Sequence, residues 1–219
     1  ERLHKGRYLK KHLGFIIYIA LTQKVYRPTQ KTFLGNKRRK KRYMKNTINK
    51  KNKIISFSLW GQDPKYVIGA LRNAELAKEI YPGWIARFYT AASVPPQIIN
   101  TLSSHSHVQV VHKPSWGDWK SMFWRFEPAS EEDVEVMISR DTDSRLNYRE
   151  KAAVEEWISS DKLFHIMRDH PYHKFPVLGG MWGAKSGACN NMSQLIEEFG
   201  GTNEYGTDYV FFAQKVLPQ

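Results

Sequence analysis

The chain has 219 residues, 41% of them hydrophobic and 13% aromatic, which is enough for one domain of ordinary size with a hydrophobic core. Its formal net charge of +13 is unevenly distributed: residues 1–53 hold 18 Lys or Arg and one acidic residue, a charge of +17, whereas residues 54–219 carry −4. The mildly acidic body argues against a fold built mainly to wrap a nucleic-acid backbone.

Cysteine content and hydropathy indicate the cellular compartment of the protein. The single cysteine, Cys189, excludes an intrachain disulfide and fits a reducing compartment, so we expect a cytoplasmic protein. The longest apolar run near the N-terminus, residues 15–21, is far shorter than the roughly 20 residues that cross a bilayer. No obligate protein partner is evident from the sequence.

Residues 1–53 are interpreted as a basic, poorly ordered N-terminal extension, followed by a catalytic domain at 54–219. The extension lacks a sustained amphipathic period, and the six consecutive basic residues at 37–42 would repel one another if packed. One interpretation is a tether to an anionic surface, either membrane headgroups or nucleic acid, which would make the protein peripheral to a membrane. The other is a solvated leader without a role.

The remaining chain alternates between predicted strands and helices. Apolar, β-rich runs predict strands at 54–59, 84–89, 108–111, 134–138 and 164–167. Helical spacing of apolar residues predicts helices at 64–81, 95–102, 147–158 and 208–216. This order predicts a single α/β domain with a mainly parallel central sheet flanked by helices.

The strand at 134–138 ends abruptly in charged residues. Asp141 and Asp143 are separated by one residue, so both carboxylates can turn toward one point, a spacing suited to a hard cation such as Mn²⁺ or Mg²⁺. Arg140 and Arg145 flank the pair and would share the negative charge of a bound phosphate. An isolated Asp-x-Asp pattern is also common in ordinary turns, so its context has to decide.

Two further features point to the same edge of the sheet. Arg125 lies in an aromatic stretch about 16 residues before Asp141, so one helix and one strand later the chain can return to the same edge. Gly179 and Gly180 allow a close backbone approach, either to a bound molecule or to another strand.

Four motifs in a fixed order resemble those of a known enzyme group. They are Phe-Trp-Arg-Phe at 123–126, Met-Ile-Ser-Arg-Asp-Thr-Asp-Ser-Arg-Leu at 137–146, His-Ile-Met-Arg-Asp-His-Pro-Tyr-His at 165–173 and Leu-Gly-Gly-Met-Trp-Gly at 178–183. The series resembles nucleotide-sugar-dependent glycosyltransferases of the GT-A fold found in large DNA viruses and bacteria, and more distantly glycogenin-like enzymes. The resemblance covers roughly residues 54–217.

The resemblance implies a role for each matching residue. Asp141 and Asp143 would bind the Mn²⁺ or Mg²⁺ that bridges the donor diphosphate, with Arg125 near the donor. Leu59, Trp60 and Gly61 match the strand end that seats the nucleoside. Gly179 and Gly180 match a turn beside the sugar, and Asp208 matches an acidic residue near the reaction centre.

The chain departs from the group's pattern in two places. Asp208 is followed by Tyr209, where many relatives have Asp-Gln, which puts the contact made by that glutamine in question. Relatives usually place a third metal ligand, often a histidine, beyond the position corresponding to residue 219, so the resemblance implies a domain that is incomplete at its C-terminal end.

The predicted activity is a hexosyltransferase-like transfer of a sugar from a nucleotide-sugar donor to a hydroxyl acceptor, such as a glycan. An inverting enzyme needs a general base, for which Asp169, Asp208 and His170 are candidates, whereas a retaining enzyme needs none. Two alternatives stay open: a metal-dependent nucleotidyltransferase or nuclease, and a non-catalytic module tethered by its basic tail.

Overall fold

A computed structural model describes residues 16–17 and 51–218 of the chain. In this part of the chain, seven strands form one sheet in the order β1-β6-β7-β5-β2-β3-β4. The strands are β1 (Ile16–Ile17), β2 (Asn52–Leu59), β3 (Ile85–Thr90), β4 (Val108–His112), β5 (Val134–Arg140), β6 (Phe164–Met167) and β7 (Met181–Lys185).

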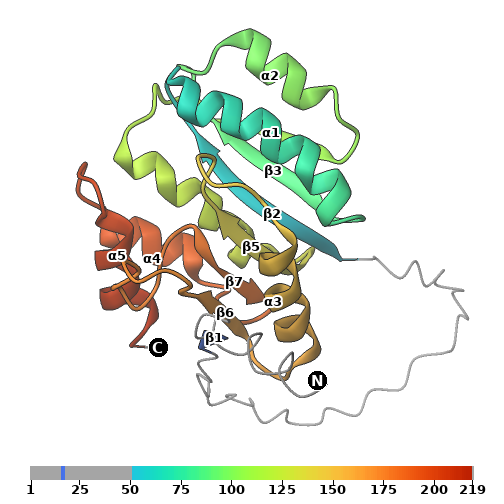
Figure 1. Cartoon of the computed structure of the whole chain (residues 1–219). Helices are drawn as coiled ribbons and strands as arrows, with labels where there is room; N and C mark the ends of the chain where they lie inside the picture. The colour runs from blue at the N-terminus through green and yellow to red at the C-terminus, as the bar shows by residue number, and fades with distance from the viewer. Residues whose placement is uncertain (1–15, 18–50, 219) are drawn as a thin grey trace, which may run out of the picture.

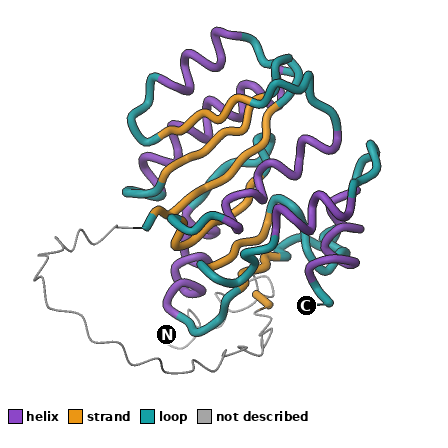
Figure 2. Tube along the Cα trace, turned by 180° about the vertical axis from the view of Figure 1, so that it is seen from behind, coloured by secondary structure: helices purple, strands orange, loops and turns teal. Residues whose placement is uncertain are grey.

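Helices flank this sheet (Figure 1), and the view from behind shows the strands running together through the middle of the domain (Figure 2). The helices are α1 (Pro64–Ile80), α2 (Pro96–Ser103), the 3₁₀ helix η1 (Trp119–Ser130), α3 (Tyr148–Ser159), α4 (Met192–Phe199), α5 (Thr207–Phe211) and the π-helical turn η2 (Phe212–Val216). No helix of the described residues has the length and apolar character needed to cross a bilayer.

The sheet separates two hydrophobic layers, because successive side chains of a strand point to opposite faces. In β2, Ile55, Phe57 and Leu59 pack in the layer formed with α1 and α3, whereas Ile54 packs in the layer that contains η1, α4 and α5. In β5, Ile138 and Met137 divide between the layers in the same way. Both faces of the central strands are therefore buried, which explains their nearly continuous apolar sequences.

Strand directions confirm the expected α/β class with a mainly parallel sheet. Strands β5, β2, β3 and β4 run parallel to one another, while β7 pairs antiparallel with both β5 and β6. The sequence did not predict β7, because the segment after the Gly179–Gly180 turn is short and has no clear strand pattern. Gly183 lies within this strand, where a Cβ atom would come 2.7 Å from the Met137 carbonyl oxygen, so only glycine fits the close pairing.

The predicted elements match the observed bounds within two residues. The predicted helix 208–216 corresponds to a continuous helical segment, Thr207–Val216, in which α5 changes to the π-helical turn η2 at Phe212. The aromatic stretch forms η1, a 3₁₀ helix with Pro128 inside it, and α4 was not predicted as an element.

The predicted N-terminal extension lies almost entirely outside the described residues. Two parts of it are described: β1, whose Ile16 and Ile17 pair antiparallel with Met167 and Ile166, and the start of β2 at Asn52. The division of the chain at residue 53 stays a prediction for the rest of this segment.

Candidate active site

A cavity of about 770 Å³ opens at the edge of the sheet where β2, β5 and β6 end. The segments that follow these three strands line it, together with the glycine turn before β7 and the start of α5. Ligands of open α/β sheets bind at the carboxyl ends of strands, so this cavity is the candidate active site.

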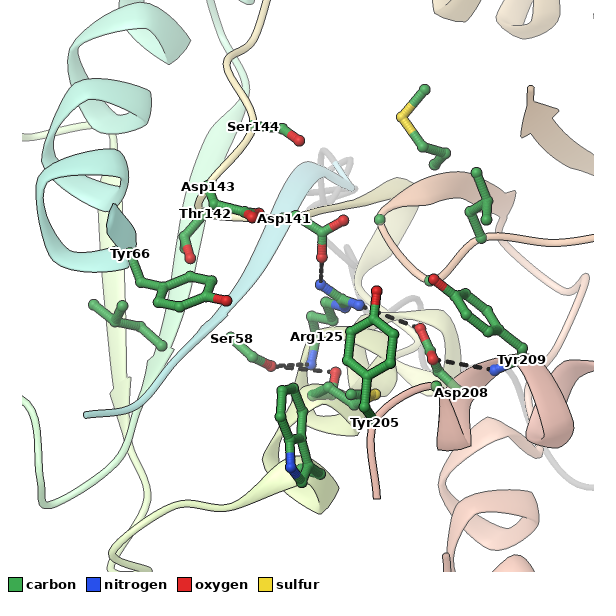
Figure 3. A pocket seen from close by; sticks show the side chains of 18 of the residues that line it. Ser58, Tyr66, Arg125, Asp141, Thr142, Asp143, Ser144, Tyr205, Asp208 and Tyr209 are labelled. Carbon is green, nitrogen blue, oxygen red and sulfur yellow. Dashed lines mark hydrogen bonds and ion pairs between the residues drawn. The ribbon is translucent and has the colours of Figure 1, made fainter. Parts of the chain in front are cut away.

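Asp141 follows β5 directly and projects into the cavity (Figure 3). Its side chain is 42% exposed, and one carboxylate oxygen forms an ion pair with Arg125. A Cβ atom at Gly180 would lie 1.9 Å from the other carboxylate oxygen, Oδ2. Glycine at position 180 therefore leaves the space that the Asp141 carboxylate occupies.

Arg125 connects two carboxylates from distant parts of the sequence. Its Nη2 lies 3.6 Å from Oδ2 of Asp208, while Nη1 pairs with Asp141 (Figure 3). The backbone N–H of Arg125 donates to the Ser58 hydroxyl at 3.1 Å, and this hydroxyl donates to the Met122 carbonyl at 3.3 Å. Because Arg125 is also 94% buried, it is held in place in the wall of the cavity.

Asp208 lies on the first turn of α5 and is itself buried. Burial raises the pKa of its carboxyl group above the usual value, the guanidinium of Arg125 opposes this shift, and the negative charge of Asp141 adds to it. A Cβ atom at Gly179 would lie 2.0 Å from Asp208 Oδ2, so Gly179 makes room for this carboxylate as Gly180 does for Asp141.

Asp143 has a cationic partner of its own. Nζ of Lys65, in the first turn of α1, lies 2.7 Å from Asp143 Oδ2. The hydrogen bond and the charge of Asp143 raise the pKa of the Lys65 ammonium group. The sequence did not single out Lys65, because nothing in its spacing indicates that the start of α1 meets the turn after β5.

The two aspartates fit a metal ion that arrives with a phosphate ligand. Both follow the same strand and line the same cavity, but the described residues contain no cluster of three or more Asp, Glu, His or Cys able to hold a metal. A hard cation such as Mg²⁺ is commonly held by one or two carboxylates together with substrate phosphates and water. The donor set therefore matches a metal–diphosphate complex better than a metal held by protein ligands alone.

The residues predicted to seat a nucleoside lie along one side of this cavity. Leu59, Trp60 and Gly61 line it where β2 ends. Gly61 has φ = +74°, a conformation that favours glycine, and its N–H donates to the Ser93 hydroxyl at 2.8 Å. The Trp60 ring packs edge-on against Trp119, with 6.1 Å between ring centroids.

The predicted general bases occupy three different environments. Asp208 is buried beside Arg125. Asp169 lines the cavity but forms an ion pair with Arg149 and lies 3.2 Å from Nδ1 of His173. His170 is exposed, is not among the residues that line the cavity, and accepts a hydrogen bond from the Tyr172 backbone N–H at 3.2 Å. Of the two nearby histidines, it is His173 that faces the cavity.

The two arginines that flank the aspartates lie in different places, and only Arg145 reaches the cavity. Arg140 is 98% buried and absent from the cavity wall; its Nε donates to Glu150 at 2.5 Å and its Nη1 to the Trp182 carbonyl at 3.2 Å. Because residues of a strand alternate between its faces, Arg140 turns into the protein, and we assign it a structural role in place of the expected donor contact. Arg145 does line the cavity, and its Nη1 donates to the Thr142 and Ser144 carbonyls at 3.1 and 2.9 Å.

An aromatic rim surrounds the cavity and was missed by sequence reasoning. Rings from separate segments line it: Tyr66, Trp119, Tyr172, Phe175, Tyr205 and Tyr209. Phe175 stacks on Tyr209 at 4.1 Å, and Trp119 meets Tyr205 edge-on at 5.4 Å. Only Trp119 belongs to the aromatic stretch visible in the sequence; the others are brought together by the fold.

Comparison with known proteins gives structural matches only. No protein-family model matches the chain, and no curated protein matches it by sequence. A solved structure described as a glycosyltransferase involved in the glycosylation of the major capsid of PBCV-1 superposes with a TM-score of 0.51 at 14% identity, covering 76% of both chains. The chain has a GT-A-like α/β fold.

Two other structures are similar at lower scores. One is a mannosyltransferase from Pyrobaculum calidifontis in complex with GDP-Man and Mn²⁺, with a TM-score of 0.48, 13% identity, and coverage of 73% of this chain and 50% of that one. The other is a 4-diphosphocytidyl-2C-methyl-D-erythritol synthase from Anaerococcus prevotii, with a TM-score of 0.47, 11% identity, and coverage of 76% and 83%.

Proposed function

We propose that the protein is a metal-dependent glycosyltransferase that moves a sugar from a nucleotide-sugar donor to a hydroxyl acceptor. The observation that carries this proposal is the single cavity in which Asp141 and Asp143 meet Arg125 and the end of β2. Its volume of about 770 Å³ is in the range of small-molecule and cofactor sites.

Asp141 and Asp143 would hold Mn²⁺ or Mg²⁺ through their carboxylate oxygens. A divalent cation bound there neutralises charge on the departing diphosphate without a proton transfer. Leu59, Trp60 and Gly61 would seat the nucleoside beside it. Two arginines and two glycines complete the donor region. Arg125 and Arg145 support the aspartates and the turn that holds them. The missing side chains of Gly179 and Gly180 leave space for the carboxylates.

The acceptor would enter over the exposed part of the aromatic rim. Tyr172 and Tyr205 are 80% and 76% exposed while they line the cavity, and such rings offer apolar faces with a polar edge. These properties suit a glycan, whose sugar rings have apolar C–H faces and hydroxyl edges. Asp208 and Asp169 are the carboxylates positioned to accept a proton from its hydroxyl group, if the reaction inverts the anomeric centre.

The test is turnover of nucleotide sugars. Purified protein is incubated with Mn²⁺ and a panel of UDP- and GDP-linked sugars while release of nucleoside diphosphate is recorded, with Asp143→Asn as the inactive variant. Asp161→Asn is the matched control, because Asp161 is 84% exposed and forms its ion pair, within the described part of the chain, with its neighbour Lys162. We expect release that requires metal, persists in Asp161→Asn and falls at least about a hundredfold in Asp143→Asn, the order of loss typical when one electrostatic contact is removed from an active site.

Other outcomes of this experiment separate the alternative functions. Release of pyrophosphate from nucleoside triphosphates, or cleavage of nucleic acid, without nucleotide-sugar turnover would instead indicate a nucleotidyltransferase or nuclease. No turnover of any of these substrates would point to a non-catalytic module.

A further inference from the structure

Both aspartates of the proposed metal site already have a cationic side chain as partner. Arg125 pairs with Asp141, and Lys65 lies 2.7 Å from Asp143. The two cations come from η1 and α1, and the two residues lie 60 positions apart in the sequence. In this state each carboxylate is neutralised by the protein itself.

These ion pairs oppose the binding of a free divalent ion. An ammonium group on a carboxylate oxygen occupies the direction along which a metal would coordinate, and its charge repels a second cation. A metal ion that binds alone must therefore either separate the Lys65–Asp143 pair, which leaves the ammonium without this partner, or bind the other Asp143 oxygen against the repulsion of the ammonium charge.

A diphosphate changes this balance, because its oxygens can accept the released cation. Lys65 can make that exchange: its side chain is 59% exposed, on a flexible stem, and its neighbours Asp63 and Tyr66 line the cavity. Arg125 cannot move as freely, since its side chain is only 7% exposed and it lies between Asp141 and Asp208. Lys65 is thus the movable member of the pair of cations.

We propose that Lys65 is an internal competitor for Asp143 that makes metal binding depend on the donor diphosphate. This inference rests on the proposed function and adds a residue that the sequence did not indicate. In the metal-free protein, Lys65 occupies the charge position of the metal at Asp143. When metal and diphosphate bind together, the ammonium group leaves Asp143 and contacts a phosphate oxygen.

The proposal implies positive coupling between the two ligands. A nucleoside diphosphate should raise the affinity for metal, and by linkage the metal should raise the affinity for the diphosphate by the same factor. Replacing Lys65 by a neutral side chain of similar length should increase the affinity for metal alone. It should also decrease the affinity of the metal-loaded protein for diphosphate. The factor by which each ligand raises the affinity for the other should therefore fall.

The experiment measures Mn²⁺ binding by titration calorimetry and by the EPR signal of free Mn²⁺, without nucleotide and with saturating UDP or GDP. It compares wild type, Lys65→Met and Lys78→Met. Lys78 is the matched control: an exposed lysine in the last turn of the same helix, roughly 20 Å along the axis from Lys65. We expect Lys65→Met to bind Mn²⁺ alone about two- to fivefold more tightly than wild type, the range for loss of one partly exposed ion pair.

The controls distinguish this idea from the proposed function. Lys78→Met should behave as wild type, so an equal gain in both variants would reduce the effect to net charge and overturn the role of Lys65. Unchanged or weaker binding of Mn²⁺ alone by Lys65→Met, with wild type still binding Mn²⁺ and diphosphate, would also overturn it and leave the proposed function intact. Absence of Mn²⁺ binding by all three proteins, with and without nucleotide, would contradict the proposed function and this inference together.

Discussion

At the scale of single residues, the glycine pair before β7 is explained by the carboxylates that lie against it. Gly180 and Gly179 lack the Cβ atoms that would collide with Asp141 and Asp208. The sequence indicated a close approach at these glycines, but the partner was expected to be a bound molecule or a strand. The partners are side chains of the site, which no spacing in the sequence identifies.

The substitution Gly180→Ala tests this explanation. The added methyl group would have to displace the Asp141 carboxylate, because its position lies 1.9 Å from Oδ2. We expect a loss of Mn²⁺-dependent UDP or GDP binding of about tenfold or more, measured by calorimetry, since a metal ligand shifted by even an ångström loses its geometry. Because the Asp141 side chain is 42% exposed, its displacement should change thermal unfolding little. Undiminished nucleotide binding by Gly180→Ala would show that the carboxylate position is not needed.

Asp208 predicts a pH-dependent contribution to stability. Its pKa is raised in the folded protein, mainly by burial, so the folded state holds its proton to higher pH than the unfolded state does. Below its usual pKa of 3.8, Asp208 is protonated in both states and does not affect the free energy of unfolding. As pH rises from there through the folded-state pKa, the carboxyl group lowers the stability of the folded protein, because the unfolded state ionises first.

The variant Asp208→Asn should remove this penalty while its Oδ1 keeps the hydrogen bond from the Tyr209 N–H. We expect its melting temperature to exceed that of wild type at pH 7 by a few degrees, roughly what 1 kcal/mol produces in a domain of this size. The difference should shrink as pH falls toward 4. A gain of equal size at pH 4 and pH 7 would exclude titration of Asp208 as the cause.

At the scale of elements, β5 and the turn after it are anchored from within the protein. Arg140 ends β5 and donates to Glu150 of α3 at 2.5 Å, with both side chains buried. The sequence contains two arginines that flank two aspartates, but it could not separate their roles. The direction in which each arginine side chain points depends on the residue at which β5 ends, and the sequence does not fix that residue. The structure directs Arg140 inward and keeps Arg145 at the cavity.

Breaking this anchor should affect stability strongly. Glu150→Ala leaves the Arg140 guanidinium buried without its partner, so we expect the free energy of unfolding to fall by about 3–5 kcal/mol in urea titrations. Glu156→Ala, at an exposed position of the same helix, should stay within about 0.5 kcal/mol of wild type. Similar losses in the two variants would mean that Arg140 does not depend on Glu150.

At the scale of the whole molecule, the α/β class and most elements could be predicted, because buried strands and amphipathic helices leave strong periodic signals. The antiparallel strand β7 could not, since its sequence, Met-Trp-Gly-Ala-Lys, is short and interrupted by Gly183. The site was only partly predictable, because some of its residues come together only in the folded chain. Asp141 and Arg125 were found from local motifs, whereas Lys65 and the aromatic rim reach the cavity through the fold.

The charge asymmetry of the molecule leads to a prediction about its surroundings. The basic run at residues 37–42 lies in a segment of charge +17 beside a body of −4. Replacing all six basic residues by Gln should strongly weaken salt-sensitive cosedimentation with phosphatidylserine vesicles, since each such residue contributes about 1 kcal/mol to attachment near an anionic surface. Nucleotide binding should be unchanged. Vesicle binding that is equally strong after the replacement, or absent in wild type, would count against a tether.

The central claim is that Asp141 and Asp143 jointly hold a divalent ion against a diphosphate, and thermal unfolding tests it most directly. Wild type, Asp141→Asn and Asp143→Asn are melted with and without Mn²⁺ plus UDP or GDP; the amides keep the shape of the carboxylates without their charge. A ligand present at a hundred times its dissociation constant stabilises the folded state by about 2.7 kcal/mol, so wild type should gain several degrees and the two variants almost none. Equal gains in all three proteins would contradict the claim.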